Sequence, residues 1–201
     1  MPQTQLEVPL RRLRLELAWL HTEFCALAIG PASRQTQLGC EMTVIRMHDA
    51  WARFCRELII LSALGDVVTA SGQTLSRSLP LIVSHASVIP VLLKIANRPW
   101  EPKWASSAEC IRAAKQLQIQ NLSNVSAALG AANSPADSLR KVRNYYAHRN
   151  QGTSDTALQT RSFQTSNHPD VFQLNGYISG GITVFDSWSQ GLKAVAVAAI
   201  Q

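Results

Sequence analysis

The side chains best suited to chemistry lie in one short stretch, Arg143-Asn144-Tyr145-Tyr146-Ala147-His148. An imidazole has a pKa of about 6.5, so a neutral His148 can take a proton from a hydroxyl group near physiological pH. The guanidinium of Arg143 stays charged and presents a fork of donors that fits phosphate oxygens. The pair therefore predicts chemistry at a phosphodiester, with His148 as the base and Arg143 stabilising the negative charge of the transition state.

Such a reaction needs neither a metal nor a cofactor. A ribose 2′-hydroxyl that loses its proton attacks the adjacent phosphorus and leaves a 2′,3′-cyclic phosphate and a 5′-hydroxyl. DNA lacks the attacking hydroxyl and would be inert, so RNA is the expected substrate.

Arg143 and His148 do not share one face of a helix. At about 100° per residue, five positions amount to about 500°, so the two side chains project about 140° apart. Asn144 precedes His148 by four positions and shares its face, so its amide can orient the imidazole. Two copies of the helix end, related by a two-fold axis, can place arginines and histidines around one cleft. Two such copies would form a homodimer with a composite site, for which Arg143, His148 and Asn144 are the candidate catalytic residues.

Further basic and aromatic residues surround this motif. We expect Arg140, Lys141 and Arg149 to hold the flanking RNA backbone, and Tyr145 to stack on a base. An ordinary alternative for His148 and Arg149 is that they are helix-end residues, because the helix dipole favours cations at a C-terminus by about 0.3 to 1 kcal/mol. Tyr145 has the corresponding alternative of packing in the core.

The form R-N-x-x-x-H near the end of a basic helix resembles the motif of the HEPN superfamily of small all-helical domains. In catalytic members, R-x4-6-H with a polar residue after the arginine marks a metal-independent endoribonuclease. The resemblance covers residues 5–150 and is specific at residues 140–150. It implies a HEPN-like bundle of four or five helices and a homodimer. It also implies a bacterial toxin or anti-phage defence effector, with an antitoxin or defence-system partner protein. The alternative function is a non-catalytic helical module for dimerisation or for binding RNA or a nucleotide.

His48 and Asp49 form a second polar pair, close to Trp51. An acid–base role is one interpretation, and salt-bridged surface residues around a buried tryptophan are the favoured one. The four cysteines show neither CxxC pairs nor zinc-like spacing to histidines, which argues against a metal site. The chain has no P-loop, GxGxxG or G-x-S-x-G motif, so ATP hydrolysis and acyl transfer lack support.

The hydrophobic spacing predicts a mainly all-α fold. Apolar residues repeat at intervals of three and four over 6–27 and again over 44–61, with a linker containing Gly39 between them. Residues 66–105 form an irregular insertion, in which Pro80 and Pro90 break any long helix and only 87–96 is helical. Trp100 and Trp104 are expected to anchor the insertion to the core, with base stacking as the alternative.

Helix signals return after the insertion. Ser106 and Glu109 form a capping-box pattern, and Ser134 followed by Pro135 begins a helix that Gly152 is expected to close. Residues 171–185 predict a small β-hairpin-like segment around Asn175-Gly176, with a second bend at Gly180-Gly181. Asp186-Ser187 would cap a last helix. We predict a single domain over 1–201, with a hairpin and helix embellishment at 155–201.

Composition is typical of a folded chain that tolerates a polyanionic partner. The 201 residues carry 19 basic and 13 acidic side chains, a net charge of +6. The stretch 137–149 alone contributes +3, from four basic side chains less Asp137. No segment has the pattern of a signal peptide or an apolar membrane span, so we expect a cytoplasmic protein without a membrane partner.

Overall fold

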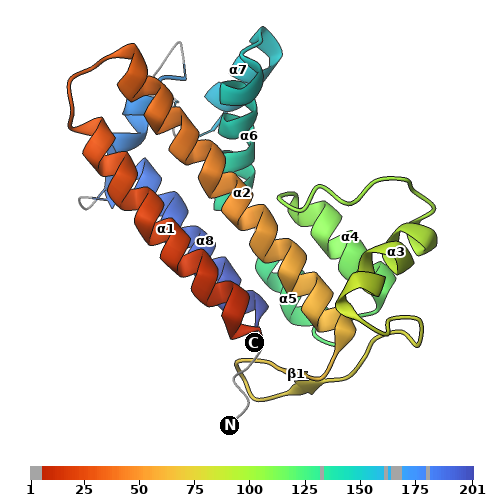
Figure 1. Ribbon diagram of the computed structural model, residues 1–201. Helices are drawn as coiled ribbons and strands as arrows, with labels where there is room; N and C mark the ends of the chain where they lie inside the picture. The colour runs from red at the N-terminus through yellow and green to blue at the C-terminus, as the bar shows by residue number, and fades with distance from the viewer. Residues whose placement is uncertain (1–5, 132–133, 161–162, 164–168, 180–181) are drawn as a thin grey trace. The chain divides into compact units, whose positions relative to one another are not determined.

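Leucines and aromatic residues spaced three and four apart produce long helices at the start of the chain. The computed structural model describes residues 6–131, 134–160, 163, 169–179 and 182–201. Within them it contains eight α-helices: α1 (Glu7–Ala28), α2 (Arg34–Leu64), α3 (His85–Ala96), α4 (Ser107–Leu117), α5 (Leu122–Leu129), α6 (Pro135–His148), α7 (Gln151–Leu158) and α8 (Val184–Ala199) (Figure 1). The expectation of a mainly α-helical fold is therefore confirmed.

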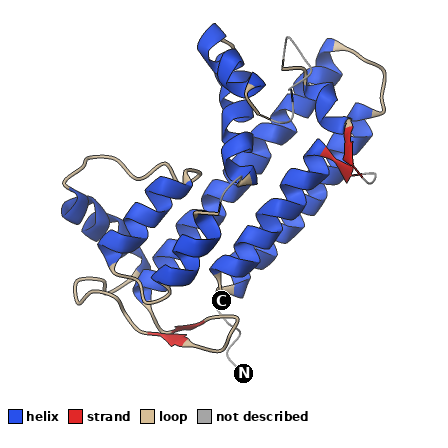
Figure 2. Cartoon of the chain, turned by 180° about the vertical axis from the view of Figure 1, so that it is seen from behind, coloured by secondary structure: helices blue, strands red, loops and turns tan. Residues whose placement is uncertain are grey.

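Strands make up little of the described chain. β1 (Val67–Val68) pairs antiparallel with β2 (Thr74–Leu75), and β3 (Tyr177–Ser179) pairs antiparallel with β4 (Ile182–Thr183). Figure 2 shows the described strands as short red arrows. No helix in the described ranges is long and apolar enough to cross a membrane.

The chain divides into two compact units, each built from separate segments. The first unit comprises Met1–Leu13, Trp51–Ala132 and Lys193–Gln201, and the second comprises Arg14–Ala50 and Asn133–Leu192. Helices α1, α2 and α8 each contribute one part to each unit. All residues of the 140–149 stretch belong to the second unit.

In the first unit, the residues after α2 leave the helical part and return to it. The main-chain N–H of Ala70 donates to the carbonyl of Ile200 at 2.9 Å, which ties the β1–β2 loop to the end of α8. Trp104 is 8% exposed, and its Nε1 donates to Glu101 at 2.8 Å, as expected of an anchor. Trp100 is 76% exposed and anchors nothing in this way, which corrects that prediction.

The short helix predicted over 87–96 is confirmed as α3, which contains Pro90 on its second turn. One further prediction for the first unit, the capping box, is wrong. Ser106 precedes α4 without a capping hydrogen bond from its side chain. The Glu109 carboxylate accepts from Arg98 at 2.9 Å and from Arg112 at 2.8 Å, so charged partners outcompete the capping box.

In the second unit, the C-terminal part of α1 lies beside the first half of α2 and the start of α8 (Figure 1). Arg46 of α2 stacks over the Trp19 ring of α1, with 4.3 Å between its guanidinium carbon and the ring centroid. Phe24 of α1 stacks on Phe185 of α8 with centroids 4.1 Å apart. Phe24 and Phe185 are both fully buried, so their stacking holds α1 against α8.

Glycines did not act as the predicted breaks in the second unit. Gly39 lies within α2, where a Cβ would be 3.0 Å from the Leu27 side chain of α1, so the glycine allows close helix packing. Gly152 lies in the first turn of α7, which Asn150 caps by accepting from the Thr153 N–H at 2.9 Å. The helix predicted to end at Gly152 thus ends at His148, and a new one begins.

The C-terminal elements differ in register from the prediction. Residues Val171–Asn175 form a 3-10 helix in place of the first hairpin strand, and the strand pair is β3 with β4. Gly180 and Gly181 lie outside the described residues. Thr183, in place of Asp186, caps α8: its hydroxyl accepts from the Asp186 N–H at 3.1 Å, and the Asp186 carboxylate accepts from the Thr183 N–H at 3.4 Å.

Candidate functional site

Helix α6 carries the candidate residues, and its boundaries are set by local sequence. The Ser134 hydroxyl accepts from the Ala136 N–H at 3.4 Å, and Pro135 occupies the first helical position. The helix ends at His148, after which Arg149 adopts the left-handed conformation with φ 47°. Because α6 is continuous from Arg143 to His148, one copy of the helix holds these two side chains about 140° apart.

Arg143 is a half-buried cation, and the part of the chain that the structure describes provides no counter-ion for it. Its Nε is buried and has no hydrogen-bond partner, and no carboxylate pairs with its guanidinium among the described residues. Arg140 lies one turn earlier on the same flank, and its Nε reaches only the Asp137 carboxylate, at 3.7 Å. Half-buried guanidinium groups with so little compensation favour an anion beside them.

His48 of α2 lies within electrostatic range of these arginines. Its Nδ1 lies 3.3 Å from Oδ1 of Asp49. The His48 side chain is 14% exposed and the Asp49 side chain 47%, so only the histidine of the expected surface pair is largely buried. Burial lowers the pKa of His48, the nearby charges of Arg143 and Arg140 lower it further, and Asp49 opposes them. Within one copy of the chain, the histidine near Arg143 is therefore His48.

The sequence contains a signal for this placement that the motif search missed. Glu41 and His48 are seven positions apart, which puts them on one face of α2 among apolar residues. That face packs on α6, because the Glu41 carboxylate accepts from the Arg149 guanidinium. Polar residues repeating on an otherwise apolar seam indicate buried polar contacts.

His148 occupies the other flank of α6 and is exposed. Within the described chain, no hydrogen bond joins it to Asn144, which is half-buried on the neighbouring turn. Lys141 is also half-buried and lies on the His148 side of the helix. The predicted catalytic residues thus lie on one helix, but their side chains do not come together within a single copy of the chain.

Two of the side chains expected to contact RNA are instead engaged in the folded protein. Arg149 pairs with Glu41, whose side chain is only 5% exposed. Tyr145 is 6% exposed, which leaves little of its ring for stacking on a base. Among the four residues predicted to bind RNA, Arg140 and Lys141 therefore remain the better placed.

A second cluster in this unit contains a thiol. His21 Nε2 lies 3.5 Å from Cys25 Sγ and 2.5 Å from Asp186 Oδ1. A nucleophile, base and orienting acid must use both ring nitrogens in relay, whereas here one nitrogen faces both groups. Burial raises the pKa of the Cys25 thiol, and Asp186 raises it further. The cluster therefore does not supply an activated nucleophile.

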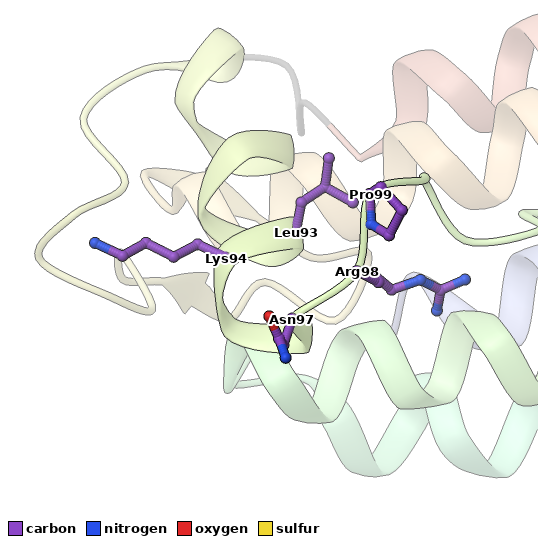
Figure 3. A pocket seen from close by; sticks show the side chains of 5 residues that line it. All are labelled: Leu93, Lys94, Asn97, Arg98 and Pro99. Carbon is purple, nitrogen blue, oxygen red and sulfur yellow. The ribbon is translucent and has the colours of Figure 1, made fainter.

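A surface hollow lies in the first unit. It is a shallow pocket lined by Leu93, Lys94, Asn97, Arg98 and Pro99 (Figure 3). Lys94 and Arg98 extend in opposite directions, and Arg98 is paired with Glu109 at 2.9 Å. Because its cations do not converge and it holds no acid–base group, this pocket lacks the chemistry of the α6 cluster.

The function of this site is not indicated by a cluster of metal ligands among the described residues or by a known relative. No group of three or more His, Cys, Asp or Glu side chains in the described ranges has the arrangement of a metal site. Comparison with protein-family models, curated proteins and solved structures finds no match for this chain.

Proposed function

We propose that this chain is a metal-independent endoribonuclease of the HEPN type, acting on RNA as a homodimer. The observation that carries the proposal is the half-buried guanidinium of Arg143, which has no counter-ion among the described residues and lies within electrostatic range of the His48 imidazole. A phosphodiester supplies the missing negative charge, and the charge grows in the transition state of its cleavage.

The dimer supplies the second half of the site. Arg143 of one copy stabilises the phosphorus centre, and His148 of the other copy takes the proton from the 2′-hydroxyl. Exposure of His148 at the helix end supports this role, because a partner helix can reach it. Arg140 and Lys141 hold neighbouring phosphates.

We further propose that the enzyme works in the cytoplasm as a toxin or anti-phage effector controlled by a partner protein. This setting follows from the resemblance of Arg143 to His148 to the HEPN motif. The four free cysteines suit a reducing compartment.

The test is cleavage of single-stranded RNA in EDTA by the wild type, Arg143→Ala and His148→Ala. We expect the wild type to leave 2′,3′-cyclic phosphate ends, and each variant to lose about 10²- to 10³-fold in rate. Arg34→Ala removes an exposed cation from the same unit and serves as the matched control. Intact RNA with the wild type, or equal cutting by the variants, would overturn the proposal.

Mixing the two inactive variants tests the composite site. A heterodimer of Arg143→Ala and His148→Ala chains contains one site with both residues intact, so mixing should restore about a quarter of the wild-type activity. A mixture that stays inactive while forming heterodimers contradicts the composite arrangement.

A non-catalytic RNA- or nucleotide-binding module is the second candidate. The separation of Arg143 from His148 on α6 favours it, since the arginine cluster can hold phosphate without the histidine. This function predicts salt-dependent RNA binding that Arg143→Ala weakens, with no strand scission at any enzyme concentration.

A further inference from the structure

The proposed reaction needs a second proton transfer that the α6 motif leaves unassigned. When the P–O5′ bond breaks, the departing oxygen must gain a proton, and a positioned acid lowers that barrier. Arg143 cannot serve, because a guanidinium does not release its proton near neutral pH. The group sought is therefore another titratable side chain beside Arg143.

The packing of α2 on α6 places one there. The pair of Glu41 and Arg149 sets the register of these helices. His48 lies seven residues further along α2, about 10.5 Å, and its electrostatic partners Arg143 and Arg140 lie six and nine residues back along α6. The helices thus run antiparallel, with His48 level with Arg143.

The hydrogen bond of His48 fixes which ring nitrogen can act. A carboxylate only accepts, so Nδ1 carries the hydrogen that it donates to Asp49 at 3.3 Å. Nε2 is left to take up and release the working proton. The 14% exposure of the side chain leaves an edge of the ring within reach of a bound phosphodiester.

We propose that His48 is a second catalytic residue, the general acid that protonates the leaving 5′-oxygen. This inference rests on the proposed ribonuclease function. In the step, the 2′-O–H bond breaks and its proton passes to His148 of the second copy. The O2′–P bond forms, the P–O5′ bond breaks, and O5′ takes the proton from His48 Nε2. Solvent then removes the proton from His148 and returns one to His48.

Phosphate binding itself charges the acid. In the free protein, burial lowers the pKa of His48, and Arg143 and Arg140 add to the effect against Asp49. An anion seated on the two arginines offsets their charge and favours the imidazolium. Binding of RNA would thereby load His48 with the proton that it delivers.

The decisive experiment compares two substrates that differ in the leaving group. RNA needs a proton on O5′, whereas the 4-nitrophenyl ester of uridine 3′-phosphate releases a nitrophenolate that needs none. His48→Asn keeps a donor toward Asp49 and should lose about 10²- to 10⁴-fold on RNA while losing less than about tenfold on the ester. His148→Ala should lose on both substrates, and His85→Ala, an exposed imidazole in the first unit, on neither.

Two outcomes separate this inference from the proposed function. If wild-type protein cuts RNA and His48→Asn cuts it equally well, or loses equally on both substrates, the acid role is wrong and the ribonuclease stands. If the wild type cuts no RNA, both fail. Thermal unfolding of His48→Asn and of His48→Gln measures whether each variant is folded, so that a loss of activity can be assigned to the missing imidazole.

A readout independent of turnover is the NMR titration of the His48 ring protons. Adding uridine 3′-phosphate should raise the pKa of His48 in the wild type and leave it unchanged in Arg143→Ala. If the nucleotide does not change the pKa of His48 in the wild type, the placement of the phosphate beside His48 is wrong.

Discussion

The guanidinium of Arg149, at the end of α6, donates to the buried carboxylate of Glu41 on α2. Glu41 also accepts from Gln37 Nε2 at 3.0 Å, so both carboxylate oxygens have donors. A buried carboxylate needs such compensation because leaving water is costly for a charge. This pair sets the register of α2 on α6, and with it the level of His48 beside Arg143.

The first prediction concerns this pair. Arg149→Ala should lower the free energy of unfolding by about 2 kcal/mol, because Glu41 is left buried with its charge unmatched. The figure lies below the range for fully buried pairs, since the Arg149 side chain is 38% exposed and water screens it. Urea unfolding at pH 7 measures the change. Adding Glu41→Gln to Arg149→Ala should recover most of the loss, and a single variant as stable as the wild type contradicts the assignment.

Local signals predicted the elements well. The start of α6 at Ser134 and Pro135 depends on side chains within one turn, so the sequence was sufficient to place it. The seam of α1 was equally readable, and its members Leu13, Leu17 and Phe24 are all buried. Spacing along one helix is a local property, and it survives folding.

Contacts between distant segments were beyond local patterns. Glu41 and Arg149 are separated by 108 residues, and no spacing rule joins them. The same holds for His48, whose neighbouring charges Arg143 and Arg140 lie far along the chain on α6. Gly39 was misread for the same reason, since packing on Leu27 of α1 outweighs the intrinsic cost of a glycine in a helix. Gly152 was misread because a local cap, Asn150, begins a new helix there. The motif therefore located the candidate helix, while tertiary packing selected the imidazole beside Arg143.

A second prediction contrasts two glycines with positive φ in the first unit. Gly65 has φ +77°, and a Cβ there would lie 2.2 Å from the Arg77 main-chain nitrogen. Gly72 has φ +86° with nothing within 4 Å of such a Cβ. Gly72→Ala should cost about 1 kcal/mol from backbone strain alone, and Gly65→Ala about 3 kcal/mol or more because backbone must also move. Equal losses in chemical denaturation would contradict this account.

A third prediction separates the two tryptophans of the insertion. Trp104 is buried and donates to Glu101, so Trp104→Ala should cost about 3 kcal/mol of stability. Trp100→Ala should change stability by less than about 0.5 kcal/mol, because the ring is exposed. Thermal unfolding followed by circular dichroism measures both. If Trp100 stacks on RNA bases, its loss should weaken RNA binding without affecting the melting temperature.

The last prediction uses the lowered pKa of His48. The unfolded chain binds a proton at this residue near pH 6.5, more readily than the folded chain does, so wild-type stability is full above about pH 6.5 and falls as pH drops toward the folded pKa. His48→Asn cannot titrate, and its stability should fall less over the same window. Glu101 and Glu109, whose pKa values Arg56 and Arg98 lower, lose their contributions below pH 4.5 in both proteins and cancel in the comparison. Urea unfolding at steps from pH 7.5 to 5 should therefore show the wild type losing stability relative to the variant. Parallel curves would mean that His48 takes up its proton as easily in the folded chain as in the unfolded one, which its burial beside Arg143 and Arg140 does not allow.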